Sequence, residues 1–95
     1  MQEQENNKVS IIGTISEPFK LSHTLYNGYF DSEIYTTTLE IRRISGIIDR
    51  IPIELKGTRE LMESFKVGTQ VLVEGEVRTY NIEYRLKVII FVNSI

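Results

Sequence analysis

Cationic and aromatic side chains recur at alternating positions of the extended segments in this sequence. Arginine and lysine can pair with phosphates, and a tyrosine ring can stack on a nucleobase regardless of which base it is. A guanidinium plane can stack on a base as well. We therefore predict a surface that binds single-stranded nucleic acid. Its candidate residues are Arg42, Arg43, Arg50, Arg78, Tyr80, Arg85, Lys87, Tyr26 and Tyr29.

The charge balance supports a competing reading of the arginines. The chain has 11 Lys and Arg against 13 Asp and Glu, a net charge of −2, whereas a nucleic-acid-binding domain is usually basic. An outward arginine on a strand is often half of a cross-strand ion pair, with Glu40, Glu54, Glu74 and Glu76 as available partners. Any phosphate-binding surface must come from an uneven distribution of the charges.

Other chemistry finds little support in the sequence. There is no cysteine, so thiolate zinc sites and cysteine nucleophiles are excluded. His23 is the only histidine, and we expect it to be structural. Neither Asp31 with Glu33 nor Asp49 makes an acid/base pair, and no glycine-rich phosphate loop is present. We predict no enzyme activity, no metal and no cofactor.

The composition favours strands as the elements that position these residues. Ile, Val and Thr are abundant and alanine is absent, as is typical of β-structure. Alternating apolar residues predict strands over 8–16, 33–43, 48–55, 69–79 and 84–92, with a short helix after Thr58 between the third and the fourth. Five strands and one helix in this order predict an all-β OB-fold, a Greek-key barrel, over residues 7–94. Residues 1–6 are expected to form a disordered tail.

Inner and outer faces follow from the alternation. The inner positions are expected to include Ile51, Ile53 and Leu55 of the third strand, Val71, Val73 and Val77 of the fourth, and Leu86, Val88 and Ile90 of the fifth. Gly13 and Gly75 lie inside strands, where a small barrel needs a bulge or a sharp bend.

Residues 19–31 predict a loop or a wide hairpin rich in aromatic residues. Phe19 and Phe30 are expected to plug the barrel end, whereas Tyr26 and Tyr29 flank the turn dipeptide Asn27–Gly28 and should stay exposed. Tyr80 lies next to a second tight connection, over residues 80–83, and should be exposed too.

The segment Gly68–Tyr80 resembles the fourth-strand signature of bacterial single-stranded DNA-binding proteins, G-x-x-V-x-V-E-G-x-[VLI]-R-T. Asn7–Gly13, Leu39–Arg43 and Asp49–Ile53 are similar to that family in the same order. The resemblance implies an OB-fold that binds single-stranded DNA without sequence preference in replication, recombination or repair. It also implies a homo-oligomer, a dimer or a tetramer, that pairs through its first strands.

The resemblance places several residues where family members often contact DNA. Arg43, Arg78 and Tyr80 fall at such positions, and so do Arg50 and Ile82 with altered chemistry. Family members often have aromatic residues at the last two positions, and this chain has no tryptophan. The sequence stops at Ile95 before any acidic C-terminal tail of the kind this family has, so we expect either one domain of a longer protein or a tail-less relative. A tail-less, dimeric branch, the primosomal replication protein N (PriB-type) group, fits equally well and implies a role in replication restart with other replication proteins.

Two further functions remain open at this point. The chain can be a protein-interaction OB module without DNA binding, or a module that binds RNA or another oligomer through the same face. No apolar run approaches the length that spans a bilayer, and the N-terminus lacks the pattern of a secretory signal. We therefore expect a cytoplasmic protein without a membrane partner.

Overall fold

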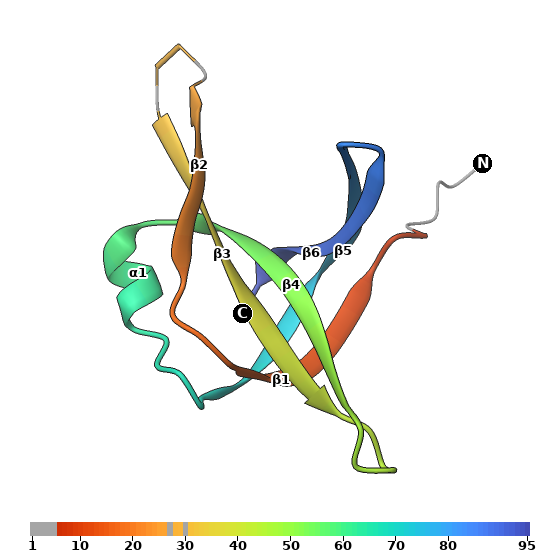
Figure 1. Cartoon of the computed structure of the whole chain (residues 1–95). Helices are drawn as coiled ribbons and strands as arrows, with labels where there is room; N and C mark the ends of the chain where they lie inside the picture. Colours follow the sequence, from red (N-terminus) through yellow and green to blue (C-terminus); the bar gives the residue numbers. More distant parts are fainter. Residues whose placement is uncertain (1–5, 27, 30) are drawn as a thin grey trace, which may run out of the picture.

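The chain folds into a small closed barrel from which two β-hairpins project (Figure 1). The computed structural model describes residues 6–26, 28, 29 and 31–95. Its elements are β1 (Val9–Ile15), β2 (Lys20–Tyr26), β3 (Asp31–Arg42), β4 (Ile48–Gly57), α1 (Arg59–Glu63), β5 (Gln70–Ile82) and β6 (Arg85–Ser94).

The strand order β1-β5-β6-β4-β3-β2 closes through an additional pairing of β1 with β3. β1 pairs with β5 from Val9 to Thr14, and then with β3 at Thr14 and Ile15. β4 and β6 form a short parallel pairing around Ile53 and Ile90, and every other pairing is antiparallel. With α1 between β4 and β5, this is the predicted OB-fold, and its five barrel strands are β1, β3, β4, β5 and β6.

β2 is a strand where the sequence predicted a loop or a wide hairpin. It pairs antiparallel with β3 from Lys20 to Tyr26, with a shift in register between Leu21 and His23. Its residues are mostly exposed, because β2 lies at the edge of the sheet and its only partner strand is β3 among the described residues. The alternation of apolar residues is therefore weak there, and the strand exists because β3 continues beyond the barrel and offers an edge to it.

The core confirms the alternation predicted for most of the barrel strands. Ile53 and Leu55 of β4 are buried in it, as predicted, and Ile90 of β6 joins them. The buried residues of this cluster are Ile15, Tyr35, Leu39, Ile53, Leu55, Met62, Val73, Ile90 and Val92. α1 adds Met62 to it, and the helix starts at the predicted cap, where the Thr58 hydroxyl accepts a hydrogen bond from the Leu61 N–H at 3.2 Å.

The prediction of the inner face fails in the first half of β6. Leu86 and Val88 were expected to point into the core, yet they are 65% and 49% exposed, and Val77 of β5, expected inside as well, is 37% exposed. The reason is that the β5–β6 hairpin extends past the barrel, so no further layer covers this face (Figure 1). β5 continues to Ile82 and pairs with Arg85, so the hairpin turn lies at Glu83 and Tyr84, later than the predicted connection at residues 80–83.

The start of the chain is attached to the barrel by a side chain. The Asn7 amide accepts a hydrogen bond from the Val77 N–H at 2.9 Å and donates one to the Val77 carbonyl at 2.8 Å. Asn7 thereby continues the contact of β1 with β5 by two more residues. Of the tail expected at 1–6, residues 1–5 lie outside the described residues. Among those described, no helix combines the length and the apolar character needed to cross a membrane.

Candidate nucleic-acid interface

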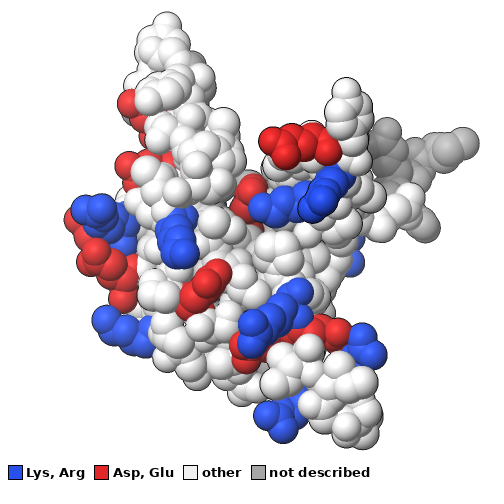
Figure 2. Space-filling view, in the orientation of Figure 1, with Lys and Arg blue, Asp and Glu red and all other residues white. Residues whose placement is uncertain are grey.

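The outward side chains of β4, β5 and β6 form a continuous surface between the two projecting hairpins. We call this surface the sheet face. Glu54 of β4 lies opposite Phe91 of β6, and Phe91 lies opposite Glu76 of β5. Two residues further along both strands, Arg78 of β5 lies opposite Ile89 of β6. After another two residues, Tyr80 lies opposite Lys87. Figure 2 shows the notch that the two hairpins leave above this part of the molecule.

Arg78 and Tyr80 lean across β6 on the sheet face. The Arg78 guanidinium carbon lies 3.9 Å from the centroid of the Phe91 ring. The Tyr80 hydroxyl reaches over β6 to Glu54 Oε2 on β4, at 3.4 Å. Ile89, below them, is 1% exposed although it points away from the main core. The two residues thus offer a half-exposed ring next to a guanidinium group, the arrangement that stacks bases and pairs with phosphates.

Arg78, Arg50 and Arg43 each have a carboxylate partner, as the ion-pair reading of the sequence anticipated. Arg78 donates two hydrogen bonds to Glu76 Oε1, at 3.1 and 2.5 Å. Arg50 lies 3.3 Å from Glu40, its register partner across β3 and β4. All of these groups are partly exposed, so the pairs are weak and a phosphate can compete for the cations.

Arg43 forms the best aligned of the three pairs. Its guanidinium donates to both oxygens of Asp49 across the turn between β3 and β4, at 2.7 and 2.8 Å. The hydrogen bond from Arg43 holds the pKa of the Asp49 carboxyl below its ordinary value of 3.8. The pKa of Arg43 is raised by the same contact, so both groups are charged at neutral pH.

Arg42, Arg85 and Lys87 are exposed and form no ion pair with another described residue. Lys87 lies beside Tyr80 across the β5–β6 hairpin, and Arg85 lies opposite Ile82 near its tip. These two cations extend the sheet face along the hairpin. Arg42 ends β3 at the other end of the barrel, opposite Ile48.

Tyr26 lies at the tip of the β2–β3 hairpin and Tyr29 lies in its connection, and both are exposed as predicted. The hairpin projects on the same side of the barrel as the β5–β6 hairpin, but the two tips are separate (Figure 1). The structure therefore divides the nine candidate residues into groups. Arg78, Tyr80, Arg85 and Lys87 share the β5–β6 hairpin, Tyr26 and Tyr29 share the β2–β3 hairpin, and Arg42, Arg43 and Arg50 lie around the β3–β4 turn.

Sequence reasoning missed three residues that belong to this surface. Tyr84 is fully exposed at the tip of the β5–β6 hairpin, and only the exact position of the turn reveals it. Phe91 lies under the Arg78 guanidinium, which is positioned over its ring. Glu54, considered above as a partner for an arginine, bonds to Tyr80 instead. Alternation from Ile53 and Leu55 predicts that Glu54 points outward, but it does not predict that neighbouring strands bury it.

The charges on this side of the molecule are mixed. Figure 2 shows lysines and arginines interspersed with aspartates and glutamates, without a continuous positive area. The uneven charge distribution that phosphate binding would need is therefore local to the β5–β6 hairpin, where Arg85 and Lys87 have no acidic partner among the described residues.

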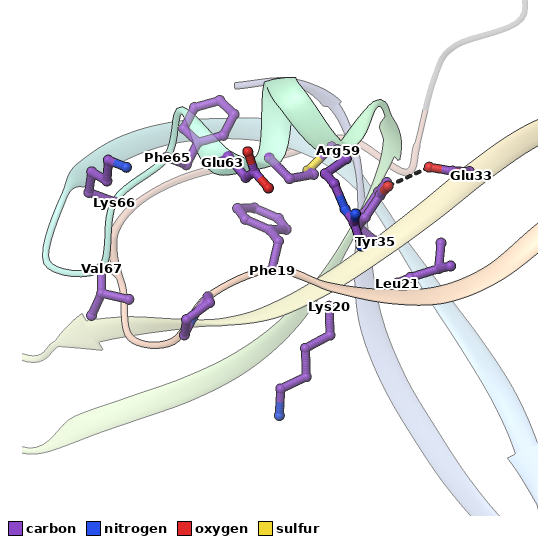
Figure 3. Close-up of a pocket in the computed structure, with 12 residues that line it drawn as sticks. Phe19, Lys20, Leu21, Glu33, Tyr35, Arg59, Glu63, Phe65, Lys66 and Val67 are labelled. Carbon is purple, nitrogen blue, oxygen red and sulfur yellow. Dashed lines mark hydrogen bonds between the residues drawn. The ribbon is translucent and has the colours of Figure 1, made fainter.

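A separate hollow of about 1020 Å³ opens beside α1 and contains none of the predicted site residues (Figure 3). Phe19 projects into it and packs against Phe65, with ring centroids 5.8 Å apart. Phe19 thus covers the barrel end, as predicted, while Phe30 lies outside the described residues. Tyr35 donates a hydrogen bond to Glu33 at the rim, and this bond raises the pKa of Tyr35.

His23 is an exposed residue of β2, and its Nδ1 lies 3.0 Å from the Ser22 hydroxyl. No group of three or more histidine, cysteine, aspartate or glutamate side chains that could hold a metal ion occurs in the described part of the chain.

The fold and sequence match a solved structure of known family. A dimeric structure of the N-terminal domain of PriB protein from Thermoanaerobacter tencongensis is 32% identical, with a TM-score of 0.74 over 94% of this chain and 92% of that chain. The chain belongs to the PriB/SSB family of OB-fold domains. The SSB domain of a Synechococcus sp. protein has the same fold, with a TM-score of 0.73, 16% identity and coverage of 98% and 97%. Neither a family model nor a curated protein sequence matches the chain.

Membership of the PriB/SSB family agrees with the signature found at Gly68–Tyr80, which forms the end of the α1–β5 connection and most of β5. That segment carries Arg78 and Tyr80, so the part of the sequence that carried the resemblance also supplies the centre of the sheet face.

Proposed function

We propose that this protein is a non-catalytic module that binds single-stranded DNA on the sheet face. The observation that supports this most is the position of Tyr80 beside Arg78, where a ring and a guanidinium group lie together on the OB-fold surface between two tyrosine-bearing hairpins. Stacking is tolerant of sequence because every base has a π-face, so binding requires no particular sequence. The contributions of Arg42, Arg43, Arg50, Arg85, Lys87, Tyr26 and Tyr29 belong to the same proposal.

We further propose that the protein works as a homo-oligomer that pairs through β1. From Val9 to Gly13, β1 pairs with β5 on one side, and no described strand covers its other side until β3 reaches Thr14. Ile12 and Leu72 lie opposite each other next to this edge and are exposed. A free strand edge with apolar neighbours suits the addition of a strand from a second copy. The dimeric state of the PriB relative supports the dimer over the tetramer.

In a cell, this function places the protein at replication, replication restart, recombination or repair, in contact with other replication proteins. We also predict a cytoplasmic location and a single domain that extends over residues 7–94.

The experiment is a titration of a labelled oligo-dT strand at two salt concentrations, with duplex DNA and oligo-U as controls. We expect salt-dependent binding to the DNA strand and little binding to the duplex. The absence of binding at low salt would indicate a protein-interaction module instead. The ion pairs of the arginines support that alternative. A preference for oligo-U would identify an RNA-binding module.

A further inference from the structure

Glu54 is a nearly buried carboxylate in the middle of the proposed DNA-binding surface. It belongs to β4, where Ile53 and Leu55 point into the core and Glu54 therefore points to the sheet face. Only 8% of the residue is exposed, because Phe91 lies opposite it on β6 and Tyr80 reaches over from β5. Acidic residues are seldom buried to this extent without a strong partner.

The partners of Glu54 do not satisfy its hydrogen-bonding capacity. Within residues 6–26, 28, 29 and 31–95, its only side-chain hydrogen bond is the long one from the Tyr80 hydroxyl to Oε2, and no lysine or arginine forms an ion pair with it. The three arginine pairs involve other carboxylates. A carboxylate can accept about four hydrogen bonds, so Glu54 keeps most of its acceptor sites for another donor.

The second oxygen of Glu54 is not completely buried. In the described part of the structure, no fully buried side-chain oxygen or nitrogen lacks a hydrogen bond. Since Oε1 has no such bond, it must retain some accessible surface. A ligand lying on Tyr80 would bring its own donors to this oxygen and would displace water from a carboxylate that is already largely dehydrated.

The bases of a single strand expose their Watson–Crick edges and can be read by hydrogen bonds. Guanine offers two adjacent donors on this edge, N1–H and the N2 amino group, which match the two oxygens of a carboxylate. Thymine offers one N–H between two carbonyl oxygens, which a carboxylate repels. A carboxylate at the hydroxyl end of a stacking ring therefore selects guanine over thymine.

Building on the proposed function, we propose that Glu54 is a specificity-determining residue that accepts hydrogen bonds from a guanine stacked at Tyr80. Binding to the rest of the strand stays independent of sequence. Glu54 thus adds one position of preference to a surface that otherwise holds any single strand.

The test compares three short labelled oligo-dT strands that differ at one central position, which carries thymine, guanine or hypoxanthine. Hypoxanthine keeps N1–H and lacks the amino group. We expect the guanine strand to bind at least about fivefold more tightly than the thymine strand, since a bidentate contact to a base discriminates by roughly 5- to 150-fold. The hypoxanthine strand should lose most of this gain.

Glu54→Gln tests the residue itself, since it keeps the shape and replaces one acceptor oxygen by a donor. The variant should bind the guanine and thymine strands with equal affinity. Glu60→Gln is the matched control, because it makes the same chemical change on α1, away from the sheet face, so the guanine preference should remain. If Glu54→Gln does not fold, the affinities of the wild-type protein for the three strands still decide whether a guanine preference exists.

The outcomes separate the two proposals. Equal affinity of the wild type for all three strands would overturn the role of Glu54 and leave DNA binding intact. A guanine preference that survives in Glu54→Gln would assign the preference to another residue. A wild-type protein that binds none of the strands at low salt would overturn the proposed function and the role of Glu54 with it.

Discussion

The guanidinium of Arg43 donates hydrogen bonds to both carboxylate oxygens of Asp49 across the turn between β3 and β4, with N–O distances of 2.7 and 2.8 Å. In this pair, Asp49 competes with phosphate for a cation that the family resemblance assigned to DNA. A carboxylate and a phosphate compete for the same planar fork of donors, so the aspartate sets how available Arg43 is.

Asp49→Asn should therefore strengthen binding to oligo-dT. The substitution removes the competing charge, so Arg43 can neutralise one more phosphate and the salt slope should steepen by about 0.7. Glu60→Gln, on α1, is the control because it changes the net charge equally and lies on another element. A steeper slope in both variants would mean that net charge alone is responsible.

The same pair predicts the direction of a pH effect. The pKa of Asp49 is lower in the folded chain than in the unfolded chain, because Arg43 bonds to the charged form. Its stabilising contribution is therefore present above the unfolded pKa, near 3.8, and is lost as the pH falls through the folded pKa. Titration of the Asp49 carboxyl by NMR should show the low pKa, and Arg43→Ala should return it to its ordinary value. An ordinary pKa in the wild type would mean that the pair does not persist in solution.

Tyr80→Ala should weaken oligo-dT binding by about 1–3 kcal/mol without unfolding the barrel, because a stacked base is lost. Tyr80→Phe should bind thymine strands nearly as well as the wild type does. Fluorescence titration measures both, and circular dichroism checks the fold. Unchanged affinity in Tyr80→Ala would mean that no base stacks there.

Arg78→Ala should lower the magnitude of the salt slope by about 0.7, the value for one phosphate on a single strand. Glu76→Gln should have the opposite effect, since Glu76 holds the same guanidinium in the free protein. An unchanged slope in Arg78→Ala would leave Arg78 as a surface ion-pair residue that rests on Phe91.

The turn of the β5–β6 hairpin predicts a conflict between stability and binding. Glu83 and Tyr84 have φ of 50° and 65°, a left-handed conformation that glycine adopts without cost. Tyr84→Gly should stabilise the protein by roughly 1 kcal/mol in denaturant unfolding. It should also weaken oligo-dT binding if the exposed ring stacks on a base. A variant that is more stable and binds equally well would mean that the Tyr84 ring does not contact DNA.

Gly75 of β5 pairs with Val9 of β1 on one side and with Val92 of β6 on the other. A Cβ at this position would lie 2.1 Å from the Phe91 carbonyl oxygen, which is backbone and has no room to move aside. Gly75→Ala should therefore lower the free energy of unfolding by about 1–3 kcal/mol or more. Gly68→Ala is a useful comparison, because there the cost comes from a φ of 89° without any steric contact. Equal losses in the two variants would contradict the steric argument.

Predictions from the sequence succeed where one strand contacts the core directly. Ile53 and Leu55 alternate with outward residues, and both are buried as predicted. The prediction of a bend at Gly75 is also confirmed, since the register of β5 and β6 shifts between Glu74 and Gly75. In both cases, the local residue pattern and the position of the residue in the barrel favour the same conformation.

Predictions fail where a segment leaves the barrel or where several strands act together. Leu86 and Val88 alternate correctly, yet they are exposed because the hairpin that carries them extends beyond the core. Glu54 is buried by residues of β5 and β6, far along the chain, so no local pattern can reveal its surroundings. The candidate arginines are arranged by the β3–β4 turn and by two hairpins, and only the assembled sheet shows which of them lie together.

The pairing of β1 with β5 also sets the order in which this chain can fold. Val9 lies opposite Gly75, so β1 pairs with a strand that is separated from it by most of the chain. The hairpins β2–β3 and β5–β6, as well as the β3–β4 pair, involve neighbouring segments and need only short loops to close. Closing a long loop costs more entropy and slows folding. We therefore expect the hairpins to form first and β1 to dock last, so that the edge proposed for the second copy is completed only in the final step.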